Sequence, residues 1–188
     1  KSGRCNLMEG RYVMHANSCA LFRKHVLPLF LPGISVLEVG PHYENRPSEN
    51  WWCPFDLLKD SGAIYHHAAL ENFERDGSQR VVMLDEYTLK CQSNLFDVVF
   101  TTNVIEHVRR IWTWTRELSR VIRSGGLLVH VNPVSWPFHE SPVDCWRIYP
   151  DGHRALFEDS GLEKVFTWHG CLTGDGVIDC VAVGRKRE

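Results

Sequence analysis

Two histidines, His107 and His139, are the clearest candidates for acid–base chemistry in this sequence. His107 ends the segment NVIEH (residues 103–107), and His139 lies in a stretch rich in proline and aromatic residues (133–150). Because a free imidazole has a pKa near ~6.5, either side chain can take a proton from a hydroxyl group at neutral pH. A helix-terminal histidine that only forms hydrogen bonds is the simpler interpretation of His107. We rank His107 first and His139 second as a general base.

Three carboxylates stand where predicted strands end. Glu38 is followed by Gly40-Pro41, and Asp85-Glu86 closes another apolar segment. A glycine there lets a ligand approach the backbone, and these acids can accept hydrogen bonds from an ammonium group or an exocyclic amine. Plain turns or helix caps explain them equally well. The second and third glycines of a G-x-G-x-x-G motif are missing, which disfavours a dinucleotide pyrophosphate and a nicotinamide-dependent enzyme.

The segment 133–150 is long for a loop and carries His139, Glu140, Asp144 and Arg147. Long loops in compact domains are usually functional or disordered, and the aromatic residues here favour an ordered loop. One interpretation is a lid over a substrate. The other is a metal site formed by His139, Asp144 and His153. These three residues include no closely spaced pair such as H-x-D, so we predict no metal.

Composition excludes several classes of protein. The chain has 188 residues, 44% hydrophobic and 23% charged, with a formal net charge of −2. These values are typical of one globular domain and give no overall attraction for nucleic acid or an anionic membrane. The seven cysteines form no C-x-x-C pair, which favours free thiols in a reducing compartment and therefore a cytoplasmic location. No apolar run approaches the ~18 residues of a membrane span.

The candidate residues need a scaffold of alternating strands and helices. Apolar, β-branched segments predict strands at 34–40, 63–70, 80–84, 96–102, 127–132, 163–169 and 177–184. Helical periodicity predicts helices at 18–31, 104–123 and 150–160, with Ser18 and Asp151 as candidate caps. This alternation is typical of a doubly wound α/β sheet, in which ligands bind outside the carboxyl ends of the strands.

The segment 96–163 also resembles a known family. FDVVFTTNVIEH (96–107), RVIRSGG (120–126) and the loop residues PFH and DCWR are similar to the class I S-adenosylmethionine-dependent methyltransferases, the type 11 group in particular. The resemblance extends over roughly 31–185. It implies a Rossmann-like, seven-stranded sheet that is mostly parallel with an antiparallel C-terminal strand. We divide the chain into an N-terminal arm and helix (1–31) and the S-adenosylmethionine-binding methyltransferase domain (32–188).

The resemblance also implies roles for single residues. Glu38, Gly40 and Pro41 match the motif around the methionine end of the cofactor, and Asp85, followed by Glu86, matches the acid that contacts the adenine amine. Glu71 is the nearest carboxylate to the expected ribose-binding position. The remaining matches are the cofactor-lining pair after the fourth strand, its neighbouring histidine, and the loop over the substrate: Asn103, Val104, His107, His139, Asp144, Trp146 and Arg147.

Methyl transfer from S-adenosylmethionine to a small molecule is therefore the expected function. The acceptor would be a hydroxyl or amine, for example of a sugar or natural product, and a nitrogen acceptor would need no base. We expect neither nucleic acid nor a membrane as a partner, and the oligomeric state stays open. The first motif has one glycine where the family often has three. A degenerate, non-catalytic cofactor-binding or partner domain is therefore the alternative.

Overall fold

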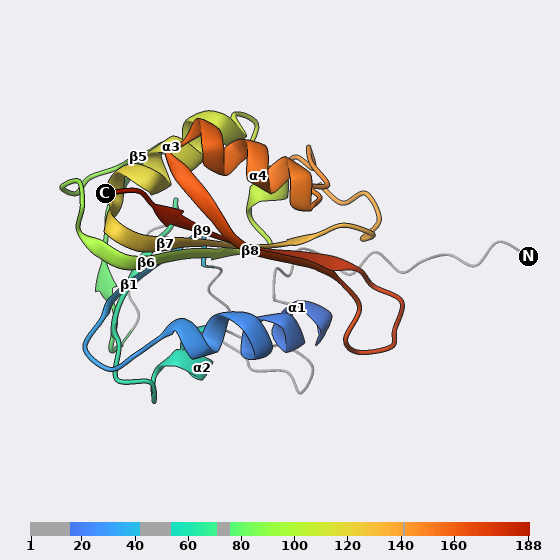
Figure 1. Cartoon of the computed structure of the whole chain (residues 1–188), viewed down its shortest axis with the longest axis horizontal. Helices are drawn as coiled ribbons and strands as arrows, with labels where there is room; N and C mark the ends of the chain where they lie inside the picture. The colour runs from blue at the N-terminus through green and yellow to red at the C-terminus, as the bar shows by residue number, and fades with distance from the viewer. Residues whose placement is uncertain (1–15, 42–53, 71–75, 141) are drawn as a thin grey trace, which may run out of the picture.

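The computed structural model describes residues 16–41, 54–70, 76–140 and 142–188. Within these residues the main feature is a seven-stranded sheet with the order β3-β2-β1-β6-β7-β9-β8 (Figure 1). Its strands are β1 (Ser35–Val39), β2 (Ile64–Ala68), β3 (Gln79–Arg80), β6 (Phe96–Thr102), β7 (Ile122–Pro133), β8 (Leu162–Gly170) and β9 (Asp179–Lys186).

The sheet is parallel except for one strand. β9 pairs antiparallel with both β7 and β8, whereas the β1–β2, β1–β6, β2–β3 and β6–β7 pairs are parallel. β1 lies between β2 and β6. The chain adds β2 and β3 on one side of β1, and then adds β6, β7, β9 and β8 on the other side. The predicted fold class, including the antiparallel C-terminal strand, is confirmed.

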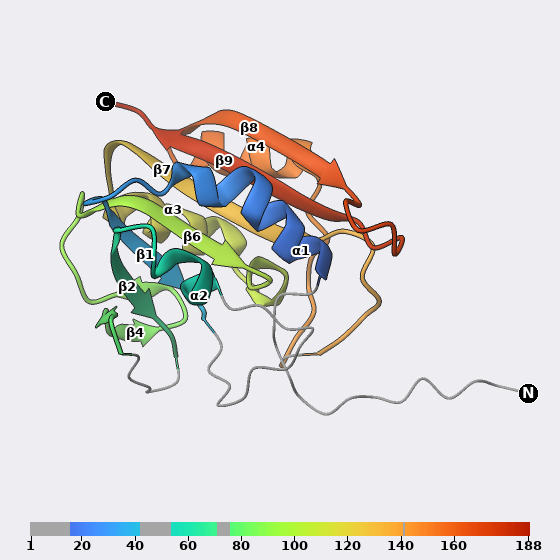
Figure 2. The ribbon, with the colours of Figure 1, turned by 90° about the horizontal axis from the view of Figure 1, so that it is seen from below.

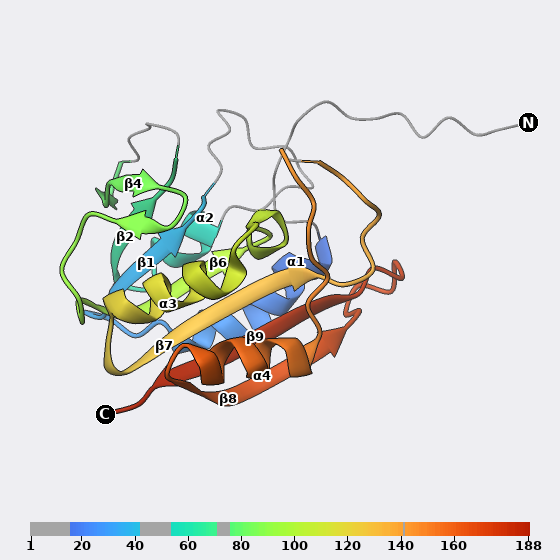
Figure 3. The ribbon, with the colours of Figure 1, turned by 90° about the horizontal axis from the view of Figure 1, so that it is seen from above.

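Helices cover both faces of the sheet. α3 (Ile111–Val121) and α4 (Pro150–Asp159) lie on one face (Figure 3), and α1 (Ala16–Leu21) and α2 (Pro54–Leu58) lie on the other (Figure 2). The chain continues from α1 through a π-helix, η1 (Phe22–Val26), and a 3₁₀ turn, η2 (Leu27–Leu29). Because both faces are covered, the central strands are apolar on both sides, as parallel sheets require.

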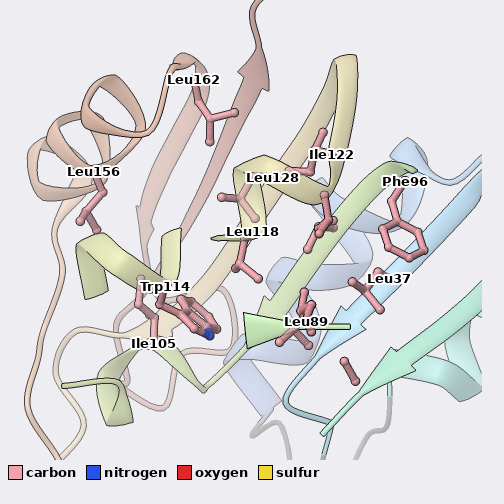
Figure 4. Close-up of a cluster of buried hydrophobic side chains, with 14 of the residues drawn as sticks. Leu37, Leu89, Phe96, Ile105, Trp114, Leu118, Ile122, Leu128, Leu156 and Leu162 are labelled. Atoms are coloured by element: carbon pink, nitrogen blue, oxygen red, sulfur yellow. The ribbon is translucent and has the colours of Figure 1, made fainter. Parts of the chain in front are cut away.

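Each face has its own hydrophobic core. Trp114 and Leu118 of α3 pack with Leu128 of β7 and Leu156 of α4 (Figure 4). On the other face, Phe22 contacts Phe100 of β6, with ring centroids 5.5 Å apart. The N-terminal helical segment therefore buries its apolar side chains against the sheet. Among the described residues, every helix is too short or too polar to cross a membrane.

Four local predictions need correction. The third strand is only Gln79–Arg80, and the apolar residues after it form an antiparallel hairpin of β4 (Met83–Asp85) and β5 (Thr88–Leu89). The helix predicted at 104–123 consists of a 3₁₀ turn, η3 (Ile105–His107), and α3. Their separation places the residues after β6 in an irregular segment, which lets them turn toward the strand ends.

The two predicted helix caps, Ser18 and Asp151, are also wrong, because both residues lie inside their helices. Ser18 lies inside α1, and its hydroxyl contacts Asn103 and Asp179 across the fold. Tyr149 occupies the N-cap position of α4 and makes no side-chain capping bond, with Pro150 at the first turn. Proline's fixed φ is already helical, so α4 can begin without a capping side chain.

Candidate active site

The ends of β1 and β6 meet at Gly40 and Val104. Gly40 has a φ of +79°, and its N–H donates to the Ala68 carbonyl at the end of β2 (2.8 Å). A Cβ atom built on Gly40 would lie 2.7 Å from Cγ2 of Val104. Glycine is therefore required here both by the backbone conformation and by the close approach of the loop after β6. The structure brings two of the predicted cofactor-binding residues into contact.

Two more predicted residues, Glu38 and Pro41, are buried beside this contact. Glu38 is only 2% exposed and pairs in register with His67 of β2 and Phe100 of β6. Pro41 follows Gly40 directly. A buried carboxyl group two residues before a positive-φ glycine stands where a ligand at the strand ends can approach it.

Asn103 connects this edge of the sheet to α1. It has a positive φ of 54°, and its N–H donates to the Val131 carbonyl of β7 (2.8 Å). Its amide oxygen accepts a hydrogen bond from the Ser18 hydroxyl (3.2 Å). Asn17 in turn donates to the buried carboxylate of Asp179 (2.8 Å). The sequence contains no motif that singles out this polar group.

The predicted adenine-binding acids lie at the end of β4, in the β4–β5 hairpin and outside the seven-stranded sheet. Asp85 is exposed and accepts a hydrogen bond from the Tyr87 N–H (2.7 Å). Glu86 is also exposed and lies 3.9 Å from the Arg109 guanidinium. Arg110 stacks over the Tyr87 ring at 4.0 Å. Glu71, the predicted ribose ligand, lies outside the described residues.

His107 and His139 are neighbours, as a joint role in acid–base chemistry requires. Their rings are perpendicular, with centroids 4.9 Å apart. Nδ1 of His107 lies 2.5 Å from the Val143 carbonyl. Because a carbonyl only accepts, Nδ1 carries the proton and the Nε2 lone pair is directed elsewhere. Burial lowers the pKa of His107, so the neutral imidazole is favoured.

Glu106 is a functional candidate that the sequence analysis did not single out. Its side chain is 1% exposed, and neither carboxyl oxygen has a hydrogen-bond partner. Burial raises the pKa of Glu106 to about 8. Oε1 lies 3.8 Å from Nε2 of His107. The signal was present in the IEH triplet, but sequence alone does not show that this glutamate points inward.

The loop after β7 holds the predicted substrate-binding residues together. The Arg147 guanidinium donates to both oxygens of Asp144, at 2.5 and 2.6 Å. The Asp144 carboxylate also accepts the His139 N–H (2.8 Å). Burial opposes ionisation of Asp144, but the hydrogen bonds from Arg147 and His139 outweigh it and lower the pKa of this carboxyl. The Trp146 indole N–H donates to the Val108 carbonyl (2.8 Å).

This loop is anchored to the segment that carries Glu106 and His107. The N–H of Cys145 donates to the Glu106 carbonyl (2.7 Å). Beside it is an open hollow of about 300 Å³. The residues that line the hollow are Trp136, Phe138, Asp144, Cys145, Trp146 and Arg147. Aromatic and charged side chains therefore surround this space, and one of them, Asp144, lies 3.3 Å from Nδ1 of His139.

The alternative metal set of His139, Asp144 and His153 does not assemble. His153 is fully buried, and its Nε2 lies 2.6 Å from the Asn132 amide oxygen. Its Nδ1 lies 3.4 Å from Nδ1 of His130. Within the described part of the chain, the potential ligands that do come together are Glu106, His107 and His139.

Comparisons with known proteins agree with this geometry. A family model described as a methyltransferase domain matches residues 61–130, which span β2 to β7. No curated protein matches the chain. The matched residues include the β4–β5 hairpin and the loop after β6, with Glu106 and His107.

Solved structures share the whole fold at low sequence identity. One is the 1,6-didemethyltoxoflavin-N1-methyltransferase of Burkholderia thailandensis, with 1,6-didemethyltoxoflavin and S-adenosylhomocysteine bound. It has a TM-score of 0.70 and 13% identity over 93% of this chain and 78% of that one. An S-adenosylmethionine-dependent methyltransferase of Mesorhizobium loti has a TM-score of 0.64 and 12% identity over 84% and 93%.

A third similar structure, the [4+2]-cyclase SpnF, has a TM-score of 0.65 and 12% identity over 90% of this chain and 80% of that one. The fold alone therefore does not determine the reaction. The match of residues 61–130 to the methyltransferase domain model, together with the sheet order and the single antiparallel strand, makes this chain similar to S-adenosylmethionine-dependent methyltransferases in its fold.

Proposed function

We propose that this protein transfers the methyl group of S-adenosylmethionine to a hydroxyl or amine of a small molecule such as a sugar or natural product. The observation that carries the proposal is the contact between Gly40 and Val104. This contact lies at the end of β1, which has β2 on one side and β6 on the other, so the order of the strands reverses there. Ligands of doubly wound sheets bind at such a reversal of strand order.

The residues around this contact suit the cofactor. When bound, S-adenosylmethionine supplies an electrophilic methyl group on a sulfonium. Gly40 lets the loop after β6 approach the end of β1 closely, and the buried carboxyl group of Glu38 would accept hydrogen bonds from the ammonium group of the cofactor. Asn103 and Val104 would line the side nearest the methyl group. Asp85 and Glu86 are the proposed acceptors for the adenine amine, and Glu71 for the ribose hydroxyls.

The acceptor would bind in the hollow beneath Trp146 and Arg147. In the displacement, the acceptor oxygen forms a bond to the methyl carbon as the S–C bond breaks, and the electron pair returns to sulfur. The acceptor proton passes to Nε2 of His107, or to His139 as the second candidate. Positioning and exclusion of water supply most of the acceleration in such a reaction.

Calorimetry with S-adenosylhomocysteine tests the cofactor site. We expect the wild-type protein to bind it at about micromolar affinity or better. Gly40→Ala should abolish measurable binding, because the new methyl group meets Val104. Gly125→Ala is the matched control, since Gly125 also has a positive φ, of 75°, but nothing lies within 4 Å of its built Cβ.

Loss of binding in both glycine variants would indicate backbone strain alone and would contradict the assignment of Gly40. No binding by the wild-type protein would overturn the proposed function. The protein could also bind the cofactor but transfer no methyl group to any hydroxyl or amine in a broad panel of acceptors. That result would favour the non-catalytic alternative. A mass increase of one methyl group on an acceptor identifies the substrate class.

A further inference from the structure

Glu106, His107 and His139 form a compact cluster of metal-binding groups. One potential ligand atom from each residue lies within 4.8 Å of the other two. The residues come from two segments far apart in sequence, η3 and the loop after β7. The backbone hydrogen bond between Cys145 and Glu106 holds these segments together.

Both imidazoles are oriented as ligands of a metal ion usually are. The Nδ1 atom of His107 donates to the Val143 carbonyl at 2.5 Å. The Nδ1 atom of His139 lies 3.1 Å from the Pro137 carbonyl and 3.3 Å from the Asp144 carboxylate. Metal-binding histidines typically donate one ring N–H to a carbonyl or carboxylate, which fixes the tautomer and turns the other nitrogen toward the ion.

Glu106 supplies the independent evidence for a ligand. Its carboxyl group is almost completely buried, and among the described residues neither oxygen has a hydrogen-bond partner. Burying a polar group in this way is costly unless a bond compensates for the lost hydration. Arg147, whose positive charge acts on Glu106, is already engaged by Asp144 through two hydrogen bonds. A cation between Glu106 and the histidines would offset the cost.

We propose that Glu106, His107 and His139 bind one divalent transition-metal ion of the zinc class. Two imidazole nitrogens and one carboxylate oxygen are a ligand set suited to Zn²⁺, Co²⁺ or Fe²⁺ and less suited to Mg²⁺, which prefers oxygen. Three protein ligands leave positions open for water or for a substrate oxygen. The side chain of His139 is 28% exposed, which gives the ion a route from solvent.

This site would change the chemistry beside the hollow. With an ion present, His107 and His139 are ligands and do not accept a proton. An acceptor hydroxyl bound to the ion would lose its proton to solvent water more readily, as metal-bound water does. The metal site itself does not depend on the proposed methyl transfer, because ion binding can be measured without cofactor or acceptor.

Titration of the metal-free, untagged protein with Co²⁺ tests the proposal. We expect one equivalent to bind, with visible absorption bands of cobalt in a nitrogen and oxygen environment, and Zn²⁺ to displace it. His139→Ala and Glu106→Gln should each weaken binding by at least about 100-fold, since even outer partners of metal ligands contribute about 10–100-fold. His139 is partly exposed, so its variant keeps the test valid if Glu106→Gln fails to fold.

The matched controls are His169→Ala and Glu158→Gln, which remove an exposed histidine and an exposed carboxylate outside the cluster. Both should bind Co²⁺ like the wild type. No stoichiometric binding by the wild-type protein would overturn the proposal. Unchanged binding in His139→Ala, or thiolate-to-cobalt absorption that indicates cysteine ligands, would also overturn it. Retained binding of S-adenosylhomocysteine in His139→Ala would show that the cofactor site is intact.

Discussion

The guanidinium of Arg147 donates hydrogen bonds to both carboxylate oxygens of Asp144, and it also donates one to the Pro137 carbonyl (3.1 Å). One planar side chain thus connects both ends of the loop after β7. Since Asp144 also holds His139, this pair positions the loop against the segment that carries His107.

Replacing Arg147 by lysine should loosen this loop. Lysine carries the same charge but cannot donate two parallel hydrogen bonds to one carboxylate. We expect Arg147→Lys to lower the free energy of unfolding by about 1–2 kcal/mol. Amide hydrogen exchange within residues 142–149 should become faster. Arg154→Lys is the control, because its ion pair with Asp151 is exposed and should contribute close to nothing. Equal effects of both variants would contradict a special role for the Arg147 fork.

The buried pair His130 and His153 should make the protein less stable in acid. Burial lowers the pKa of His153 to about 3 and the pKa of His130 well below its usual value. Each folded-state pKa is thus below the unfolded value of ~6.5, so the unfolded chain binds more protons as the pH falls. Their stabilising contribution is complete above pH ~6.5 and is lost progressively below it, by up to about 1.4 kcal/mol per pH unit for each histidine.

Urea unfolding between pH 7.5 and 5 measures this dependence. His153→Gln removes one titrating group and keeps a donor for Asn132, so its unfolding free energy should depend less steeply on pH than that of the wild type. The difference between the two slopes isolates His153 from all other groups. His169→Gln serves as the control, because His169 is exposed. Parallel slopes for wild type and His153→Gln would show that His153 is protonated in the folded state.

Loss of the Asn17 side chain should destabilise the attachment of α1. Its amide donates to Gly170 and Asp179, and its oxygen accepts the Leu172 N–H, at distances of 2.7 to 3.0 Å. Because Asp179 is fully buried, Asn17→Ala leaves a carboxylate with one fewer donor. We expect the unfolding free energy to fall by about 2–4 kcal/mol, measured by urea denaturation.

Ala16→Ser, at an exposed neighbouring position, is the control for Asn17→Ala. We expect its unfolding free energy to stay within about 0.5 kcal/mol of the wild type. If Asn17→Ala were equally mild, the polar group between α1 and β9 would not be a significant source of stability.

Local patterning was sufficient for most of the scaffold. The segment 96–102 was predicted as a strand and is β6, because a run of β-branched and aromatic residues between turn signals favours an extended conformation in any context. Helix α4 was likewise predicted at 150–160, with Pro150 at its first turn and Gly161 beyond its end at a φ of +74°. The motifs after β6 and β7 pointed to methyltransferases, and a methyltransferase domain model matches residues 61–130.

Where local patterns were ambiguous, packing decided the outcome. The segment 80–84 has the composition of one strand of the main sheet. Only Arg80 belongs to that sheet, as the end of β3, whereas Met83 and Leu84 belong to the β4–β5 hairpin. This hairpin places Leu89 in the core with α3. Ser18 looked like a helix cap, but its hydroxyl found partners on β9 and after β6. A side chain's partners depend on which distant segment the fold brings beside it, and no local pattern contains that information.

The cluster of Glu106, His107 and His139 shows the same division most clearly. The residue types and their chemistry were visible in the sequence, and both histidines were predicted as functional. That Glu106 points into the protein, and that residues 32 positions apart face one another, follows only from the packing of the loop after β7 against η3. The type of each residue, which the sequence gives, determines which reactions its side chain can support. Burial and proximity arise only on folding, and they determine which side chains can act together.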